Sequence, residues 1–93
     1  MLSYKTPFLL LQYTLTVTVV PPNAQITEKD GLVAFTKVDG QDGKFTAPVE
    51  YEQQITVVST LVGYDTIDTP VTIEAADDKA ETITMTKTKV RLL

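Results

Sequence analysis

The sequence predicts an all-β domain, a small antiparallel β-sandwich of about seven strands. Apolar and polar residues alternate with a period of two in short segments, which polar turns separate at spacings of roughly 8 to 12 residues. Threonine and valine, whose β-branched side chains favour strands, dominate these segments. No segment shows the period near 3.6 of an amphipathic helix, so the sequence favours two packed sheets.

The first expected strand covers residues 8–20. Apolar side chains occupy the odd positions from Leu9 to Val19, and Gln12 and threonines occupy the even ones, as in a half-buried strand. Phe8 and Leu10 are also apolar, so the strand begins apolar on both faces, as strands do when they are covered twice. The second cover comes either from the first residues of the chain or from another protein.

Two further strands are expected before the middle of the chain. Pro21-Pro22 ends the first strand, because neither residue can donate a ladder hydrogen bond, and a short strand starts at residues 24–26. Residues 28–31, which end in a glycine, form the next reversal. Residues 32–36 are expected to form a third strand, which is apolar on both faces and is therefore either central in a sheet or in contact with a neighbour.

The stretch from residue 39 to residue 64 organises the fold. Asp39-Gly40 and Asp42-Gly43 are suited to reverse the chain between two strands, after which Phe45 enters the core. In the apolar strand over residues 55–61, Ile55 and Val57 point to one side and Thr56 and Val58 to the other. Gly63 then allows the backbone to bend and Tyr64 anchors the corner.

The last third of the chain contains two expected strands. Residues 66–73 include Pro70, which indicates an edge strand or a bulge. After a polar turn over residues 74–80, residues 81–88 close the domain with Ile83 and Met85 inside.

The C-terminal residues change phase. Val90 and Leu92 are at even positions, whereas the inward side chains of the last strand, Ile83 and Met85, are at odd ones. We therefore expect the strand to shift register by a bulge or to change its covering surface there. The chain then ends on Leu92-Leu93.

Short motifs in the chain resemble those of known sandwich families. Asp42-Gly43-Lys44-Phe45, followed by an apolar strand and Val62-Gly63-Tyr64-Asp65, resembles the motif of carboxypeptidase regulatory-like and transthyretin-like (prealbumin-like) domains. Residues 22–26 (PNAQI) resemble the start of PEGA domains, although residues 28–36 depart from the glycine turn and "TP" segment that usually follow there. The resemblance covers residues 13–86. It implies an immunoglobulin-like or transthyretin-like sandwich that binds ligands or acts as a spacer.

Composition bounds the domain and its partners. The 93 residues are expected to form a single domain over residues 1–93, and the absence of cysteine excludes disulfides. The net charge is −4, and the basic trio Lys87, Lys89 and Arg91 is interpreted as the solvated face of a strand, so nucleic-acid binding is not expected. The apolar run near the N-terminus is too short for a signal peptide, and no run is long enough for a membrane helix.

The sequence lacks the usual inventory of an active site. It has no histidine and no cysteine, which removes the commonest general base, thiol nucleophile and transition-metal ligands. Ser59 lies in an apolar strand and is interpreted as a strand residue, not a nucleophile. The oxygen ligands of residues 39–43 do not alternate as an EF-hand calcium loop requires. We therefore expect a non-enzymatic protein without cofactor or metal.

Two functional hypotheses remain open. The first is a structural subunit that assembles through strand faces and chain ends, such as a decoration, tail or fibre component of a virus particle or an extracellular filament. It is expected to bind protein partners, as a homo-oligomer or in a larger assembly, with residues 1–12 and 88–93 as contact ends. The second is a glycan- or peptide-binding or spacer module of a larger cell-surface protein, with an exposed binding surface in the loops around residues 39–43 and Tyr51. The expected partner-binding residues are Phe8, Leu10, Tyr51, Val90, Leu92 and Leu93.

Overall fold

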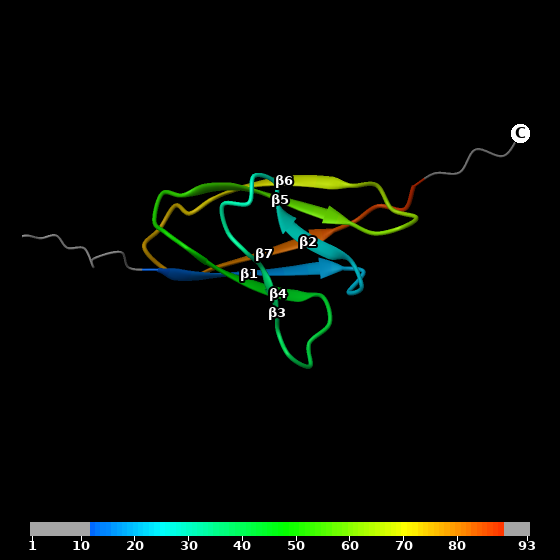
Figure 1. Ribbon diagram of the computed structural model, residues 1–93, viewed down its shortest axis with the longest axis horizontal. Helices are drawn as coiled ribbons and strands as arrows, with labels where there is room; N and C mark the ends of the chain where they lie inside the picture. Colours follow the sequence, from blue (N-terminus) through cyan, green and yellow to red (C-terminus); the bar gives the residue numbers. More distant parts are fainter. Residues whose placement is uncertain (1–11, 89–93) are drawn as a thin grey trace, which may run out of the picture.

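The computed structural model describes residues 12–88 of the chain (Figure 1). Within this range the strands are β1 (Tyr13–Val20), β2 (Gln25–Glu28), β3 (Thr36–Lys37), β4 (Lys44–Val49), β5 (Gln54–Thr60), β6 (Ile67–Thr72) and β7 (Lys79–Thr84). They form a four-stranded sheet in the order β3-β4-β1-β7 and a three-stranded sheet in the order β2-β5-β6. The two sheets pack face to face, which confirms the predicted β-sandwich.

Strand β1 shows how the alternating pattern produces the fold. Leu15, Val17 and Val19 are at most 1% exposed, because they face the opposite sheet, whereas the threonines between them lie on the outer face. The expected first strand starts at residue 8, and the part of it before residue 12 lies outside the described residues.

One strand pair differs from the antiparallel arrangement that the sequence predicts. β1 and β7 are parallel, in a register that runs from Leu15 opposite Lys79 to Val20 opposite Thr84, and the other named pairs are antiparallel. The reason is the path of the chain. After β6 it crosses from the three-stranded to the four-stranded sheet and enters β7 in the direction of β1, as a parallel pair requires.

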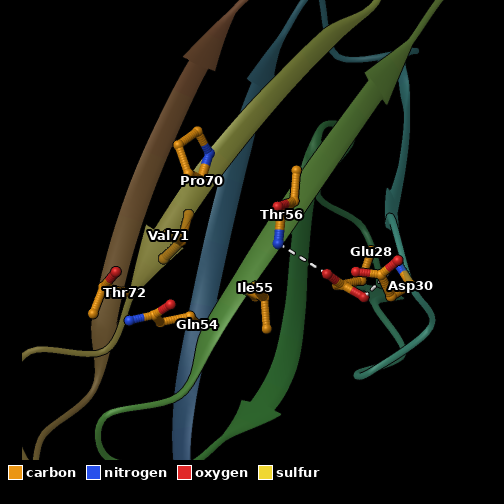
Figure 2. A pocket seen from close by; sticks show the side chains of 8 residues that line it. All are labelled: Glu28, Asp30, Gln54, Ile55, Thr56, Pro70, Val71 and Thr72. Carbon is orange, nitrogen blue, oxygen red and sulfur yellow. Dashed lines mark hydrogen bonds between the residues drawn. The ribbon is translucent and has the colours of Figure 1, made fainter.

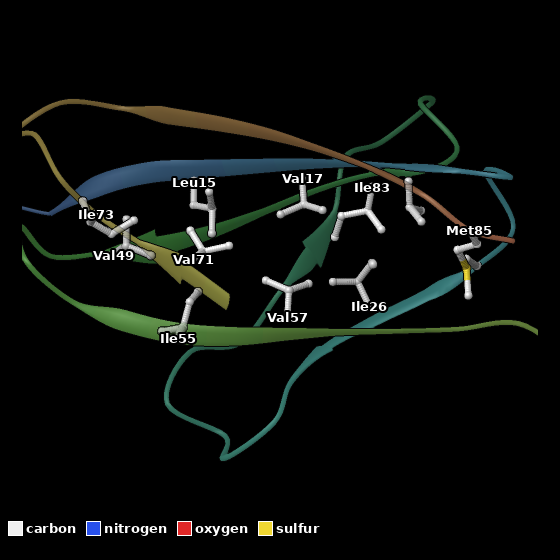
Figure 3. Packing of buried hydrophobic residues seen from close by; sticks show 12 residues of the cluster. Leu15, Val17, Ile26, Val49, Ile55, Val57, Val71, Ile73, Ile83 and Met85 are labelled. Carbon is white, nitrogen blue, oxygen red and sulfur yellow. The ribbon is translucent and has the colours of Figure 1, made fainter. Parts of the chain in front are cut away.

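The core lies between the sheets, and both contribute aliphatic side chains to it (Figure 3). The inward positions expected on β5 and the last strand are confirmed, since Ile55, Val57, Ile83 and Met85 are buried. Tyr13, Phe45 and Tyr64 pack against the cluster at its margin and stay partly exposed. The buried cluster consists of Leu15, Val17, Val19, Ala24, Ile26, Val49, Ile55, Val57, Val71, Ile73, Ile83 and Met85.

The prediction of a strand over residues 32–36 was wrong. The only residues of this region in a strand are Thr36 and Lys37, which form the short edge strand β3. The backbone before them is irregular because the Glu28 carboxylate accepts the N–H groups of Asp30 and Leu32, which diverts these groups from a ladder. Val33 and Phe35 still pack against the core, although from a loop.

The described chain starts at one end of the sandwich and finishes at the other (Figure 1). We call residues 50–53 and 74–78 the N-terminal pole, because Tyr13 lies opposite Val49 and Thr14 donates its N–H to Asp78. Residues 61–65 and 85–88 form the C-terminal pole. Tyr64 bridges to Lys87, and the Thr88 N–H donates to the carbonyl of Gly63 at 3.0 Å. The poles lie at opposite ends of β5.

Candidate protein-contact site

The outer faces of both sheets are largely polar. On the four-stranded sheet Thr16 lies between Thr46 of β4 and Ala80 of β7, and Thr18 lies between Lys44 and Thr82. The three-stranded sheet presents Thr56, Thr60 and Thr72 in the same way. The described sheet faces therefore provide no broad apolar surface for a partner. Within residues 12–88, the large hydrophobic side chains that stay exposed are Val20, Leu32, Tyr51 and Val62.

The free edge of β6 is blocked by proline. Thr56 donates its N–H to Glu28 and accepts the N–H of Lys29 on its carbonyl, so both of its backbone groups point toward β2. Pro70 lies opposite Thr56 on β6. The Pro70 nitrogen therefore faces the free edge of the sheet. Because proline has no N–H, β6 loses no hydrogen bond to β5 there, but a strand added at the free edge would find no donor at this position. The edge position predicted for this strand is confirmed.

The other sheet edges are protected as well. β2 and β3 are only four and two residues long. On β7, Lys79 and Glu81 have the same parity as Ile83 and thus point inward, with 3.4 Å between Lys79 Nζ and Glu81 Oε2. Short edges and inward charges both discourage pairing with another chain. The faces and edges of the described sandwich therefore discourage association. Of its exposed large hydrophobic side chains, Leu32 lies in the loop after β2 and Val20 at the end of β1, whereas Tyr51 and Val62 lie in turns at the two poles.

At the N-terminal pole an ordered turn presents Tyr51. The Gln53 N–H donates to the Glu50 carbonyl at 3.1 Å, and the Glu50 N–H donates to Gln53 Oε1 at 2.9 Å. Tyr51, at the second position of this turn, is 52% exposed, so its predicted exposure is confirmed. An aromatic side chain on a fixed turn can contact a partner with little loss of conformational entropy.

Glu52, the next residue of the turn, was not predicted as a site residue. Its φ is +70°, a left-handed conformation that glycine adopts without cost but that strains most other residues. Its side chain is exposed, and none of the hydrogen bonds or ion pairs among the described residues involves its carboxylate. Glu52 thus adopts a strained backbone conformation that glycine would adopt without strain. The sequence shows only that this turn contains no glycine, which does not identify the strained position.

Carboxylates surround the tyrosine at this pole. Glu50 and Glu52 flank it in the turn, and the Glu52 N–H donates to the Ile73 carbonyl at 2.8 Å, which brings the β6–β7 connection alongside. That connection carries Glu74, Asp77 and Asp78. Among residues 12–88, no three acidic side chains are grouped closely enough to hold a metal ion. The pole is therefore an anionic surface with an aromatic tip, not a cation site.

The C-terminal pole presents Val62, which the sequence analysis did not single out as a contact. The Tyr64 N–H donates to the Leu61 carbonyl at 3.0 Å, and Gly63 provides the positive φ of +88° that the turn needs. Val62 is 97% exposed. The Asp65 N–H bonds to the Thr86 carbonyl, so the chain leaving β7 braces the turn. The sequence gives no local sign that a valine next to a predicted corner glycine would project into solvent.

The other expected contact residues are placed as follows. Residues 39–43 lie toward the C-terminal pole, where the Val19 N–H donates to the Gly43 carbonyl at 2.8 Å, whereas Tyr51 lies at the other end. The single binding surface expected around both loops is therefore not formed. Phe8, Leu10, Val90, Leu92 and Leu93 lie outside the described residues.

Glu28 is the main titratable group that the fold itself uses. It lies at the end of β2 and is 7% exposed, and its carboxylate accepts the backbone N–H groups of Asp30, Leu32 and Thr56 at 2.8 to 2.9 Å. Burial raises the pKa of this carboxyl, but the hydrogen bonds, of which the one from Thr56 is the largest, together lower the pKa below its ordinary value of 4.5. Glu28 lies two residues after Ile26 on β2, so both side chains point to the same, inward face of the strand, and this spacing could have indicated a buried carboxylate.

A shallow hollow of about 240 Å³ lies beside Glu28 and is bordered by Thr56, Pro70 and Thr72 (Figure 2). Its lining contains Asp30 as a second carboxylate, but no histidine, serine or lysine. The Glu28 oxygens are already occupied by backbone amides, so this carboxylate is not free to act as a base.

Comparison with protein-family models, curated proteins and solved structures finds no match to the chain. None of the described residues belongs to a helix with the length and hydropathy needed to cross a membrane.

Proposed function

We propose that the protein is a non-enzymatic structural subunit that binds other proteins through the two poles of its sandwich. A decoration, tail or fibre component of a virus particle, or an extracellular filament, is the kind of assembly that such a subunit builds. The observation that carries the proposal is the placement of Tyr51 and Val62. These exposed apolar side chains stand on ordered turns at opposite poles, whereas the faces are polar and the edges are blocked.

The course of the chain supports the same proposal. It enters the sandwich beside the N-terminal pole and leaves it beside the C-terminal pole. In the sequence, the apolar residues Phe8 and Leu10 precede the strand that starts at the N-terminal pole, and Val90 and Leu92 follow the residues of the C-terminal pole.

A spacer or ligand-binding module of a larger cell-surface protein is the second candidate. The described chain enters the sandwich at one end and leaves it at the other, which favours this candidate, since domains joined in series need to be entered and left at opposite ends. The resemblance of residues 42–45 and 62–65 to carboxypeptidase regulatory-like, transthyretin-like and PEGA domains also supports it. In this proposal the chain is a member of that group of sandwiches, and its contacts are with neighbouring domains.

Sedimentation equilibrium of the full chain over a range of concentrations tests the first candidate. A structural subunit with adhesive poles is expected to show an average mass that rises above the monomer mass of 10.2 kDa as the concentration increases. A mass that stays at 10.2 kDa up to about 1 mM, the weak limit of specific association, would reject self-assembly and favour the spacer.

A further inference from the structure

We propose that Glu28 is an acid-sensitive switch: its carboxylate holds residues 29–35 against the sandwich, and protonation of this carboxylate releases them while the two sheets stay folded. Residues 29–35 form the β2–β3 loop, which crosses from the three-stranded to the four-stranded sheet (Figure 1). The change takes place within one chain and adds a conformational response to the proposed structural role.

The Glu28 carboxylate anchors this loop beyond its first residues. Its Oε1 accepts the Asp30 N–H at 2.8 Å and the Leu32 N–H at 2.9 Å. Its Oε2 accepts the N–H of Thr56 on β5 at 2.8 Å, so the same side chain joins the loop to the sheet (Figure 2). Of the hydrogen bonds between described residues, the one from Leu32 to Glu28 is the only one that involves residues 32–35. These four residues therefore lose their hydrogen-bonded anchor when Oε1 stops accepting.

The loop can separate without dismantling the core. Val33 and Phe35 pack against the core cluster but are only partly buried, and Leu32 is 58% exposed. No residue of the loop belongs to the buried core cluster of the described residues, and β3, which follows the loop, is two residues long. Segments with few buried apolar contacts open at a lower free energy than the whole domain. We therefore expect the loop to open before the sandwich unfolds.

Protonation is expected to act on the loop side of the carboxylate. A carboxylic acid keeps one acceptor oxygen, and its other oxygen carries a proton that conflicts with a facing N–H. A proton on Oε2 would face the N–H of Thr56, which is half-buried in β5. A proton on Oε1 faces the N–H groups of Asp30 and Leu32, which are exposed and can hydrogen-bond to water instead. The proton is therefore less costly on Oε1, where it disconnects the loop and leaves the bond to β5 intact.

The hydrogen bonds of Glu28 set the pH range of the switch. Burial raises the pKa of Glu28, but the backbone hydrogen bonds, of which the one from Thr56 is the largest, together lower this pKa below 4.5. The carboxylate is thus charged, and the loop is held, at neutral pH. Closure is strongest above pH 4.5 and is lost as the pH falls through the lowered pKa.

The other charges near the loop hold it only weakly. Its own charged side chains are Lys29 and Asp30, β5 carries none, and β6 carries Asp68. Lys29 Nζ lies 3.8 Å from Asp68 Oδ2, but both side chains are at least half exposed, so this pair contributes little. On β3, after the loop, Lys37 is bound to Asp42 at 2.6 Å. Among the described residues, Glu28 is the one buried acid, and it joins the loop to the sandwich.

An NMR pH titration of the full chain, labelled with ¹⁵N, measures the release through the protection of amides from hydrogen exchange. As the pH falls from 7 through a midpoint below 4.5, protection of the Asp30 and Leu32 amides is expected to fall at least roughly tenfold, the factor that loss of a hydrogen bond to a charged group gives. The amides of Val17 and Val57, in the buried centre of the two sheets, are expected to stay protected at the same pH.

Three full-length variants identify the titrating group. Glu28→Gln keeps the shape of the side chain without its charge, so its loop is expected to show the lowered protection already at pH 7. Asp30→Asn and Asp42→Asn remove neighbouring carboxyl groups and keep Glu28, so both are expected to release the loop at the midpoint of the wild type. If Glu28→Gln does not fold, the wild-type titration and these two controls still decide.

Other results would overturn the proposal. One is a loop that keeps its protection until Val17 and Val57 lose theirs. Another is a loop in Glu28→Gln that is as protected at pH 7 as in the wild type. Loss of the acid release in Asp30→Asn or Asp42→Asn would overturn it as well, because the release would then belong to a different carboxyl group.

Discussion

Replacement of Glu28 by glutamine removes the one buried carboxylate that holds β2, the following loop and β5 together. Its Oε1 accepts the N–H groups of Asp30 and Leu32 and its Oε2 accepts the N–H of Thr56. Glutamine keeps a single acceptor oxygen and adds an NH₂ group. Whichever way the amide is placed, a donor then faces at least one backbone N–H.

The size of the effect follows from these contacts. A hydrogen bond to a charged group contributes about 1.5 to 3 kcal/mol, and a buried donor without a partner costs about 1 to 3 kcal/mol. Asp30 and Leu32 are exposed, so water can replace part of their loss, whereas Thr56 is half-buried within β5. We expect Glu28→Gln to lower the free energy of unfolding by about 2 kcal/mol and Tm by roughly 8 to 16 °C.

The effect is expected to depend on pH. Because the folded state lowers the pKa of Glu28 below 4.5, its stabilising contribution is fully present above pH 4.5 and disappears as the pH falls through the lowered value. The difference in unfolding free energy between wild type and Glu28→Gln should therefore shrink below pH 4.5. The pKa of Asp42 is also lowered, by its hydrogen bond from Lys37 and by that charge, but Asp42 titrates in both proteins and cancels.

Urea unfolding followed by circular dichroism at pH 7 and at several values below 4.5 measures both effects. Glu74→Gln, which neutralises an exposed carboxylate, is the matched control and is expected to stay within about 0.5 kcal/mol of the wild type. A Glu28→Gln variant as stable as this control at pH 7, or a stability difference that does not decrease in acid, would contradict the prediction.

Three further substitutions test local features of the fold by thermal and urea unfolding. Gly43→Ala should lower the free energy of unfolding by more than about 2 kcal/mol, because the added Cβ would lie 2.7 Å from the Pro22 Cα. Gly40→Ala, at a similar φ but in open space, should lower it by only about 1 kcal/mol. Equal losses of stability in the two variants would refute the close approach at Gly43. Ser59→Ala should raise stability by about 1 kcal/mol, since the Ser59 hydroxyl is buried without a hydrogen-bond partner among the described residues, and a loss instead would point to a partner that the hydroxyl does bind. Glu52→Gly should stabilise the folded chain by up to about 1 kcal/mol by relieving the positive φ, and a destabilised variant would show that the glutamate is needed by the fold itself.

Local patterns predicted the parts of the fold that depend on local chemistry. The alternation in β1 and β5 placed Leu15, Val17 and Ile55 inside, because a period of two leaves a strand only one apolar face. Pro70 marked an edge, because proline removes a ladder donor. Tyr51 was expected to be exposed because it lies in a polar loop, and it is.

The remainder depended on contacts between distant segments. The parallel pairing of β1 with β7 joins residues more than sixty positions apart, such as Leu15 with Lys79, and strand order is not local information. Residues 32–36 have the pattern of a strand, but the Leu32 N–H bonds to the Glu28 carboxylate, and Thr36 is the one residue of this segment in a strand. The N-terminal pole likewise forms only when the turn at Tyr51 and the connection at Glu74 meet through the backbone of Ile73.

An NMR titration would test the central claim, association through the poles, most directly. The chain is labelled with ¹⁵N, and unlabelled wild-type chain is added to it. We expect shifts concentrated in the amides of the two poles, residues 50–53 with 74–78 and residues 61–65 with 85–88. Shifts centred on the threonine faces of the sheets, or none at all, would contradict this claim.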